Sequence, residues 1–130
     1  MIVDDNPDFV RAARLLLERE GLRVVGVAST GADAVSLLTE LRPDVTLIDI
    51  DLGGESGFEL ARRLVSSAGL DPRRLILISG HDECDFADLI EESPAVGFVA
   101  KSALSARAIE TLLHSAGYGC DDQPSEPGGR

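Results

Sequence analysis

Short apolar runs rich in β-branched residues alternate with longer segments of helical periodicity, and this alternation restricts the folds that the sequence can adopt. The runs are apolar on both faces and too short for helices, which is typical of strands in a parallel sheet covered on both sides. The candidate strands lie at residues 2–3, 24–27, 45–48, 75–78 and 96–99. The sequence therefore predicts one parallel sheet of five strands.

Helical segments follow the candidate strands. Asn6 suits the N-cap of the first helix, Pro7 its first position and Gly21 its end. The other helices are expected at about residues 30–41, 57–67, 83–92 and 106–116. Crossovers between parallel strands are almost always right-handed, so five such units predict a doubly wound α/β fold. In such a fold, the functional site lies at the carboxyl ends of the strands.

The acidic balance of the chain excludes some partners. Its 130 residues include 12 Lys plus Arg and 23 Asp plus Glu, which gives a net charge of −11 at pH 7. This charge repels phosphate backbones and anionic lipids, so we expect no direct contact with nucleic acid or membranes. The sequence has no apolar run of the roughly 20 residues that span a membrane and opens without a signal segment. We therefore expect a cytoplasmic protein.

Polar residues stand at the carboxyl ends of four candidate strands: Asp4 and Asp5, Asp49 and Asp51, Ser79, and Lys101. Carboxylates brought together repel one another and need a cation, and a hard ion such as Mg²⁺ suits oxygen ligands. A hydroxyl and an ammonium beside them could hold phosphoryl oxygens while a carboxylate attacks phosphorus. Lys101 is the only lysine in a chain that otherwise uses arginine, which favours a specific role for its compact charge.

Four segments carry these residues: IVDDN at 2–6, PDVTLIDI at 43–50, LISG at 77–80 and GFVAKS at 97–102. They resemble the signature blocks of bacterial response-regulator receiver domains, in the order and approximate spacing of that family. The resemblance covers about residues 1–117 and implies a flavodoxin-like sheet with the strand order 2-1-3-4-5, flanked by five helices.

The resemblance also implies roles for individual residues. Asp49 would be the phosphoacceptor, and Asp4 and Asp5 would hold Mg²⁺ or Mn²⁺ together with Asp49 and the backbone carbonyl of Asp51. Ser79 and Lys101 would contact the phosphoryl group. Phe98 matches the aromatic switch position.

The implied mechanism starts when a sensor histidine kinase or phosphotransfer protein passes a phosphoryl group to Asp49. Ser79 would then move toward the group and Phe98 would turn inward, which changes the surface of the fourth helix, fifth strand and fifth helix. Acidic residues crowd the fourth helix: Asp82, Glu83, Asp85, Asp88, Glu91 and Glu92. They form either a solvated face or a docking site for a basic output partner, and phosphorylation could also drive homodimerisation.

Some positions depart from the family pattern. Only three residues precede the acidic pair, so the first strand should be short. Gly53-Gly54 replaces the commoner Pro-Gly, which predicts a looser loop beside the metal. Asp51 and His81 occupy the positions that tune loss of the aspartyl phosphate in the family. His81 either positions a water molecule for this step or is a solvent-facing loop residue.

The last segment, residues 118–130, has the acidic, Pro- and Gly-rich composition of a disordered tail and is too short for an output module. The chain is therefore either a stand-alone receiver or a receiver cut from a longer transcriptional regulator. The acidic charge and the final Gly-Gly-Arg favour the stand-alone form.

Two other functions are compatible with parts of the pattern. A haloacid-dehalogenase-like phosphohydrolase would use Asp49-Ile50-Asp51 with Ser79 and Lys101, but Asp4 and Asp5 would then have no role. A receiver-like binding module that is never phosphorylated usually lacks the acceptor, the acidic pair or the lysine, and all of these are present. The pattern favours a signalling domain that catalyses only its own phosphotransfer and dephosphorylation.

Overall fold

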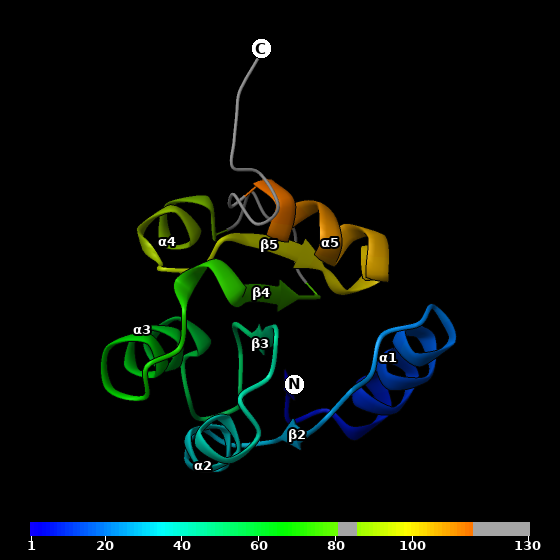
Figure 1. The fold of residues 1–130 in the computed structure, drawn as a ribbon. Coiled ribbons are helices and arrows are strands. Elements are labelled where there is room, and N and C mark those ends of the chain that lie inside the picture. The colour runs from blue at the N-terminus through cyan, green and yellow to red at the C-terminus, as the bar shows by residue number, and fades with distance from the viewer. Residues whose placement is uncertain (81–85, 116–130) are drawn as a thin grey trace.

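A computed structural model describes residues 1–80 and 86–115, which form a five-stranded sheet with helices on both faces (Figure 1). The strands are β1 (Ile2–Val3), β2 (Val27–Ala28), β3 (Thr46–Asp49), β4 (Leu75–Ser79) and β5 (Gly97–Ala100). All neighbouring strands are parallel, and their order is β2-β1-β3-β4-β5. The predicted doubly wound α/β fold and its strand order are confirmed.

The helices are α1 (Pro7–Arg19), α2 (Gly31–Leu41), α3 (Gly57–Ser67), α4 (Ala87–Glu92) and α5 (Ala106–Ser115), with short 3₁₀ turns at Pro72–Arg74 and Lys101–Ala103. Asn6 caps α1 as predicted, because its side chain accepts hydrogen bonds from two amides of the first turn. Thr30 and Ser56 cap α2 and α3 in the same way. Within the described residues, no helix is long and apolar enough to cross a membrane.

Alternate residues of each strand face opposite sides of the sheet, so two cores form. Leu75 and Leu77 of β4 pack into the core beneath α2, α3 and α4. Ile76 and Ile78 pack into the other core, against α1 and α5. Figure 1 shows the two groups of helices on opposite sides of the sheet. Burial on both faces explains why the strands are continuous apolar runs.

The second strand lies further along the chain than predicted. We expected residues 24–27, whereas β2 is Val27–Ala28, because a strand needs a partner and β1 offers only Ile2 and Val3 for pairing. β1 is short, as expected, yet it pairs on both sides, with β2 and with β3. β1 therefore lies inside the sheet and not at its edge, although only two of its residues pair.

The third, fourth and fifth strands each end one residue later than predicted. Asp49 and Ser79 are therefore the last residues of β3 and β4 rather than the first loop residues. For the helix predicted at 83–92, the structure describes α4 from Ala87 onward, preceded by Phe86, whose ring packs against Phe58. His81 and the tail at 118–130 lie outside the described residues.

Candidate functional site

Residues from four strand ends meet at one edge of the sheet. Asp4 directly follows β1, Asp49 and Ser79 end β3 and β4, and Lys101 directly follows β5. Parallel strands place their carboxyl ends at the same edge, so residues up to 97 positions apart in the sequence come together.

Three carboxylates form the centre of this site. Asp4, Asp5 and Asp49 each offer one oxygen atom, and these atoms all lie within 4.8 Å of one another. Asp4 is 2% exposed and Asp49 is 6% exposed, whereas Asp5 is open to solvent. Two of the three charges are thus held away from water, where their mutual repulsion is strong.

Backbone amides fix the orientation of the two buried carboxylates. The amide of Asn6 donates a hydrogen bond of 2.9 Å to Oδ1 of Asp4. In the same way, the amide of Asp51 donates to Oδ1 of Asp49 at 3.2 Å. Each carboxylate therefore binds the loop that follows its own strand, and its second oxygen is directed into the site.

Lys101 supplies the positive charge. Its Nζ lies 2.8 Å from Oδ2 of Asp4 and 3.2 Å from Oδ2 of Asp49, and its side chain is 19% exposed. Burial alone would lower the pKa of Lys101, but its short polar contacts and charge interactions with Asp4 and Asp49 outweigh that effect and raise the pKa. Lys101 is therefore fully charged at neutral pH.

The pKa of Asp49 is raised to about 6, chiefly because burial disfavours its charged form. The nearby charge of Asp4 raises it further, while the amide of Asp51 and the ammonium of Lys101 act in the opposite direction. Asp49 is thus the carboxylate whose ionisation is costly in the folded chain.

The donor set fits a hard divalent cation. Oδ2 of Asp4 is fully buried and, within residues 1–80 and 86–115, accepts no hydrogen bond of good geometry, although it is in ion-pair contact with Lys101. Asp5 adds an accessible oxygen on the solvent side of the cluster. Carboxylate oxygens with an open, solvated side are typical ligands of Mg²⁺ and Mn²⁺.

The other predicted residues lie around this centre. Ser79 is buried at the end of β4, where it pairs in register with Ala100 of β5. Asp51 is exposed just after β3, and its Oδ1 accepts a hydrogen bond from the amide of Gly53. Phe98 is half-buried in β5 and lines a hollow beside α5.

Sequence reasoning missed the environment of Phe9. We expected this residue only in the apolar stripe of α1, but its ring centroid also lies 4.4 Å from Nζ of Lys101. An ammonium at this distance is attracted by the face of the ring. The sequence holds no signal for this contact, because Phe9 and Lys101 are brought together only by packing of α1 against the end of β5.

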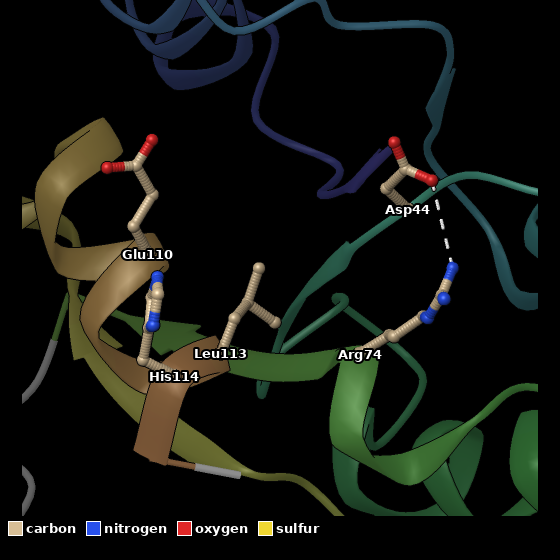
Figure 2. Close-up of a pocket in the computed structure, with 5 residues that line it drawn as sticks. All are labelled: Asp44, Arg74, Glu110, Leu113 and His114. Carbon is tan, nitrogen blue, oxygen red and sulfur yellow. Dashed lines mark ion pairs between the residues drawn. The ribbon is translucent and has the colours of Figure 1, made fainter. Parts of the chain in front are cut away.

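A different group of polar and charged residues lies at the opposite, amino edge of the sheet (Figure 2): Asp44, Arg74, Glu110 and His114, with Leu113 between them. Asp44 Oδ1 and Arg74 Nη1 are 3.7 Å apart, and the side chain of Asp44 is fully exposed. These side chains are spread around an open hollow, whereas those of Asp4, Asp49 and Lys101 are buried and converge at the carboxyl edge.

Comparison with known proteins shows which family this chain resembles. The profile of the response regulator receiver domain matches residues 1–114. The response regulator GacA of Pseudomonas aeruginosa is 35% identical over 105 residues, which are 79% of this chain and 48% of GacA. The chain thus spans about half the length of this relative.

An enzyme and a solved structure are also similar to this chain. A protein-glutamate methylesterase/protein-glutamine glutaminase of Myxococcus xanthus is 36% identical over 118 residues, which are 90% of this chain and 33% of the methylesterase. Among solved structures, a LuxR-family two-component response regulator from an Aurantimonas species matches with a TM-score of 0.74 at 34% identity, over 88% of this chain and 84% of that one.

Proposed function

The chain belongs to the family of response regulator receiver domains, and we propose that it accepts a phosphoryl group on Asp49 from a sensor histidine kinase or a phosphotransfer protein. The observation that carries this proposal is the position of Asp49. Its carboxylate ends a central strand, is 6% exposed, and lies beside the ammonium of Lys101 and the carboxylates of Asp4 and Asp5. The family match supports a histidine kinase or a phosphotransfer protein as the partner.

In the proposed reaction, an oxygen of Asp49 forms a bond to phosphorus while the bond from phosphorus to the leaving group of the donor breaks. The leaving group keeps the electron pair of that bond. Lys101 lies on the side of Asp49 Oδ2 and is charged at neutral pH, so it can pair with the phosphoryl oxygens. We propose that Ser79, the last residue of the neighbouring strand, offers its hydroxyl to the same group.

Asp4, Asp5 and Asp49, with the backbone carbonyl of Asp51, are the residues that would hold Mg²⁺ or Mn²⁺. When bound, such an ion neutralises negative charge that builds up on the phosphoryl oxygens. The protein residues contribute orientation, because the amides of Asn6 and Asp51 hold Asp4 and Asp49 in place before any donor arrives.

We propose that the signal leaves through α4, β5 and α5. Ser79 and Phe98 would act as switch residues, and the exposed Asp88, Glu91 and Glu92 of α4 favour a basic protein partner on this face or, alternatively, a solvated surface. Charge reversal in Glu91→Lys with Glu92→Lys should weaken binding of such a partner while Asp49 is still phosphorylated. Unchanged binding counts against the docking role. A phosphorylation-dependent homodimer on the same face is testable by light scattering.

We also propose that Asp51 and His81 tune the lifetime of the aspartyl phosphate. Asp51 is exposed directly beyond the acceptor strand, where it can influence water near Asp49. Time courses of phosphate loss from His81→Ala and Asp51→Asn test these roles separately. A half-life equal to that of the wild type removes the role of the residue concerned.

The phosphohydrolase alternative has less support. The family match favours a receiver, and the meeting of Asp4 and Asp5 with Asp49 accounts for the acidic pair that a haloacid-dehalogenase-like site leaves without a role. We also propose that the protein acts in the cytoplasm, where histidine kinases present their phosphoryl groups.

Intact mass after incubation with acetyl phosphate and Mg²⁺ tests the proposal directly. We expect a single phosphoryl adduct on the wild type and none on Asp49→Asn or in the presence of chelator. A folded wild type that gains no adduct and also fails to bind beryllofluoride would instead be a binding module without phosphotransfer. An adduct that persists on Asp49→Asn would show that another residue accepts the group.

A further inference from the structure

The loop between β3 and α3, residues 50–56, is more ordered than its two glycines suggest. The amide of Leu52 donates to the carbonyl of Glu55 at 3.1 Å, and the amide of Gly57 donates to the carbonyl of Ile50 at 2.9 Å. Asp51 and Ser56 form an antiparallel bridge across the loop. These bonds close the loop on itself, but they do not attach it to the rest of the protein.

The start of the loop is anchored by the buried side chains of Ile50 and Leu52 and by a hydrogen bond from the amide of Ile50 to the carbonyl of Ile78. The side chain of Glu55 adds a second attachment near the end of the loop. Its Oε1 accepts a hydrogen bond of 2.8 Å from the amide of Gly31, the first residue of α2. Arg63 of α3 lies 3.4 Å from Oε2. A carboxylate at this end of a helix is favoured by the unpaired amides and the helix dipole. Glu55 therefore links the loop to α2.

Gly31 is matched to this contact. It is buried, and a Cβ atom built on it would overlap with the carboxylate of Glu55. Any larger residue at position 31 must push the Glu55 side chain away from the amide. The contact thus depends on two residues that are 24 positions apart, a glycine on α2 and a glutamate in the loop.

The same loop also touches the acidic cluster. Gly53 has a φ of +73°, and a Cβ there would lie 2.9 Å from Oδ2 of Asp5. The amide of Gly53 donates to Oδ1 of Asp51, the residue whose carbonyl is proposed as a metal ligand. A shift of the loop would therefore change the distances between this carbonyl, Asp5 and Asp49.

We propose that Glu55 is a positioning residue for the divalent-cation site: its bond to the amide of Gly31 holds the β3–α3 loop against Asp5 and compensates for the flexible Gly53-Gly54. This inference rests on the proposed function, because the cation site includes Asp49, the proposed phosphoacceptor. Glu55 does not touch the cation in this scheme and acts through the loop backbone.

Titration of the full chain with Mg²⁺, followed by the NMR shifts of backbone amides, measures the effect. Glu55→Ala should weaken Mg²⁺ binding about tenfold, because residues that orient metal ligands have effects of this order. Glu55→Gln keeps an oxygen acceptor for Gly31 and should stay within about threefold of the wild type. Glu59→Ala removes the same charge from an exposed position of α3 and should bind Mg²⁺ like the wild type.

A double-mutant cycle separates the contact from general loop damage. Gly31→Ala should weaken Mg²⁺ binding as Glu55→Ala does, and the double variant should be no weaker than either single variant, because both remove one interaction. If Glu55→Ala does not fold, the comparison of Gly31→Ala with Glu55→Gln and Glu59→Ala still decides the question.

Several outcomes would overturn the inference. One is Mg²⁺ affinity in Glu55→Ala equal to that of the wild type, and another is an equal loss in Glu59→Ala, which would indicate long-range charge instead of positioning. Additive losses of Mg²⁺ affinity in the double-mutant cycle would show that Gly31 and Glu55 act independently. A wild type that binds no Mg²⁺ overturns the cation site and the proposed function with it, whereas normal phosphorylation with unchanged variants overturns the role of Glu55 alone.

Discussion

At the carboxyl edge of the sheet, Lys101 lies between two buried carboxylates, whereas at the amino edge Arg74 pairs with Asp44 in open solvent (Figure 2). The types of charge are the same, but the first set is 19% exposed or less and the second is 41% exposed or more. Water screens the charges of Asp44 and Arg74, so their interaction is weak. At the carboxyl edge, burial makes each charge depend on its neighbours.

This difference teaches that the convergence of buried charges, and not their number, marks the functional edge. The backbone amides of Asn6 and Asp51 hold the carboxylates of the carboxyl edge, and the pKa of Asp49 is raised as a result of burial. A cation bound between these carboxylates would relieve their mutual repulsion. Substitutions at the two edges should therefore have unequal effects.

The largest effect is expected for Lys101→Met. Removal of the ammonium leaves Asp4 and Asp49 buried without their counter-charge, so the free energy of unfolding should fall by about 4 kcal/mol at pH 7.5 without metal. Urea denaturation in the presence of chelator measures this loss. Recovery of most of the loss at pH 5, where Asp49 can take up a proton, would support the cause, and a loss below about 1 kcal/mol would contradict it.

Asp49→Asn should act in the opposite direction. The folded-state pKa of about 6 lies above 3.8, the ordinary value for an aspartate, so the folded protein binds more protons between these values and loses stability as pH rises through them. The amide removes this cost, so the variant should be more stable by about 3 kcal/mol at pH 7.5 and by about half as much at pH 5. Denaturation curves in chelator at both pH values measure the two differences, and equal differences would exclude ionisation as the cause.

A smaller effect is expected at Phe9. The double-mutant cycle of Phe9→Leu with Lys101→Met should give a coupling energy of about 0.5–1 kcal/mol, the usual range for an ammonium on an aromatic face. Phe9→Tyr keeps the ring and is the matched control, so its cycle with Lys101→Met should give a coupling energy near zero. Zero coupling in the Phe9→Leu cycle as well would mean that the ring contributes only apolar packing.

The smallest effect is expected at the amino edge. Asp44→Asn removes a fully exposed partner of Arg74, so the midpoint of urea denaturation should be unchanged within error at low and high salt. A shift comparable to that of Lys101→Met would show that exposure does not separate the two edges.

Much of the fold could be predicted because the strands are buried on both faces and the helices carry local start signals. Asn6 caps α1 and Thr30 caps α2 through contacts with residues two or three positions away, so the signal lies within the sequence window. The position of β2 could not be predicted this way, because an apolar run does not show which of its residues pair with β1. Pairing selects Val27–Ala28 and not the predicted residues 24–27. Pairing partners are properties of the sheet.

In the candidate site, too, some features could be predicted from the sequence and others could not. Residue type and strand order together predict that Asp4, Asp49, Ser79 and Lys101 share one edge, since parallel strands allow no other arrangement of their carboxyl ends. The contacts of Glu55 with Gly31 and of Lys101 with Phe9 have no sequence signal. They arise where a helix end or helix face packs beside a loop from a distant part of the chain.

The sequence by itself determined the doubly wound sheet and the polar residues at its carboxyl edge, because hydrophobic periodicity and helix caps act over a few residues. Only the tertiary structure decided how strongly each charge is buried, which amides hold it and how the β3–α3 loop is anchored. These properties depend on distances between segments that are far apart in the chain, and solvent exclusion at their meeting point sets the energies of the charges.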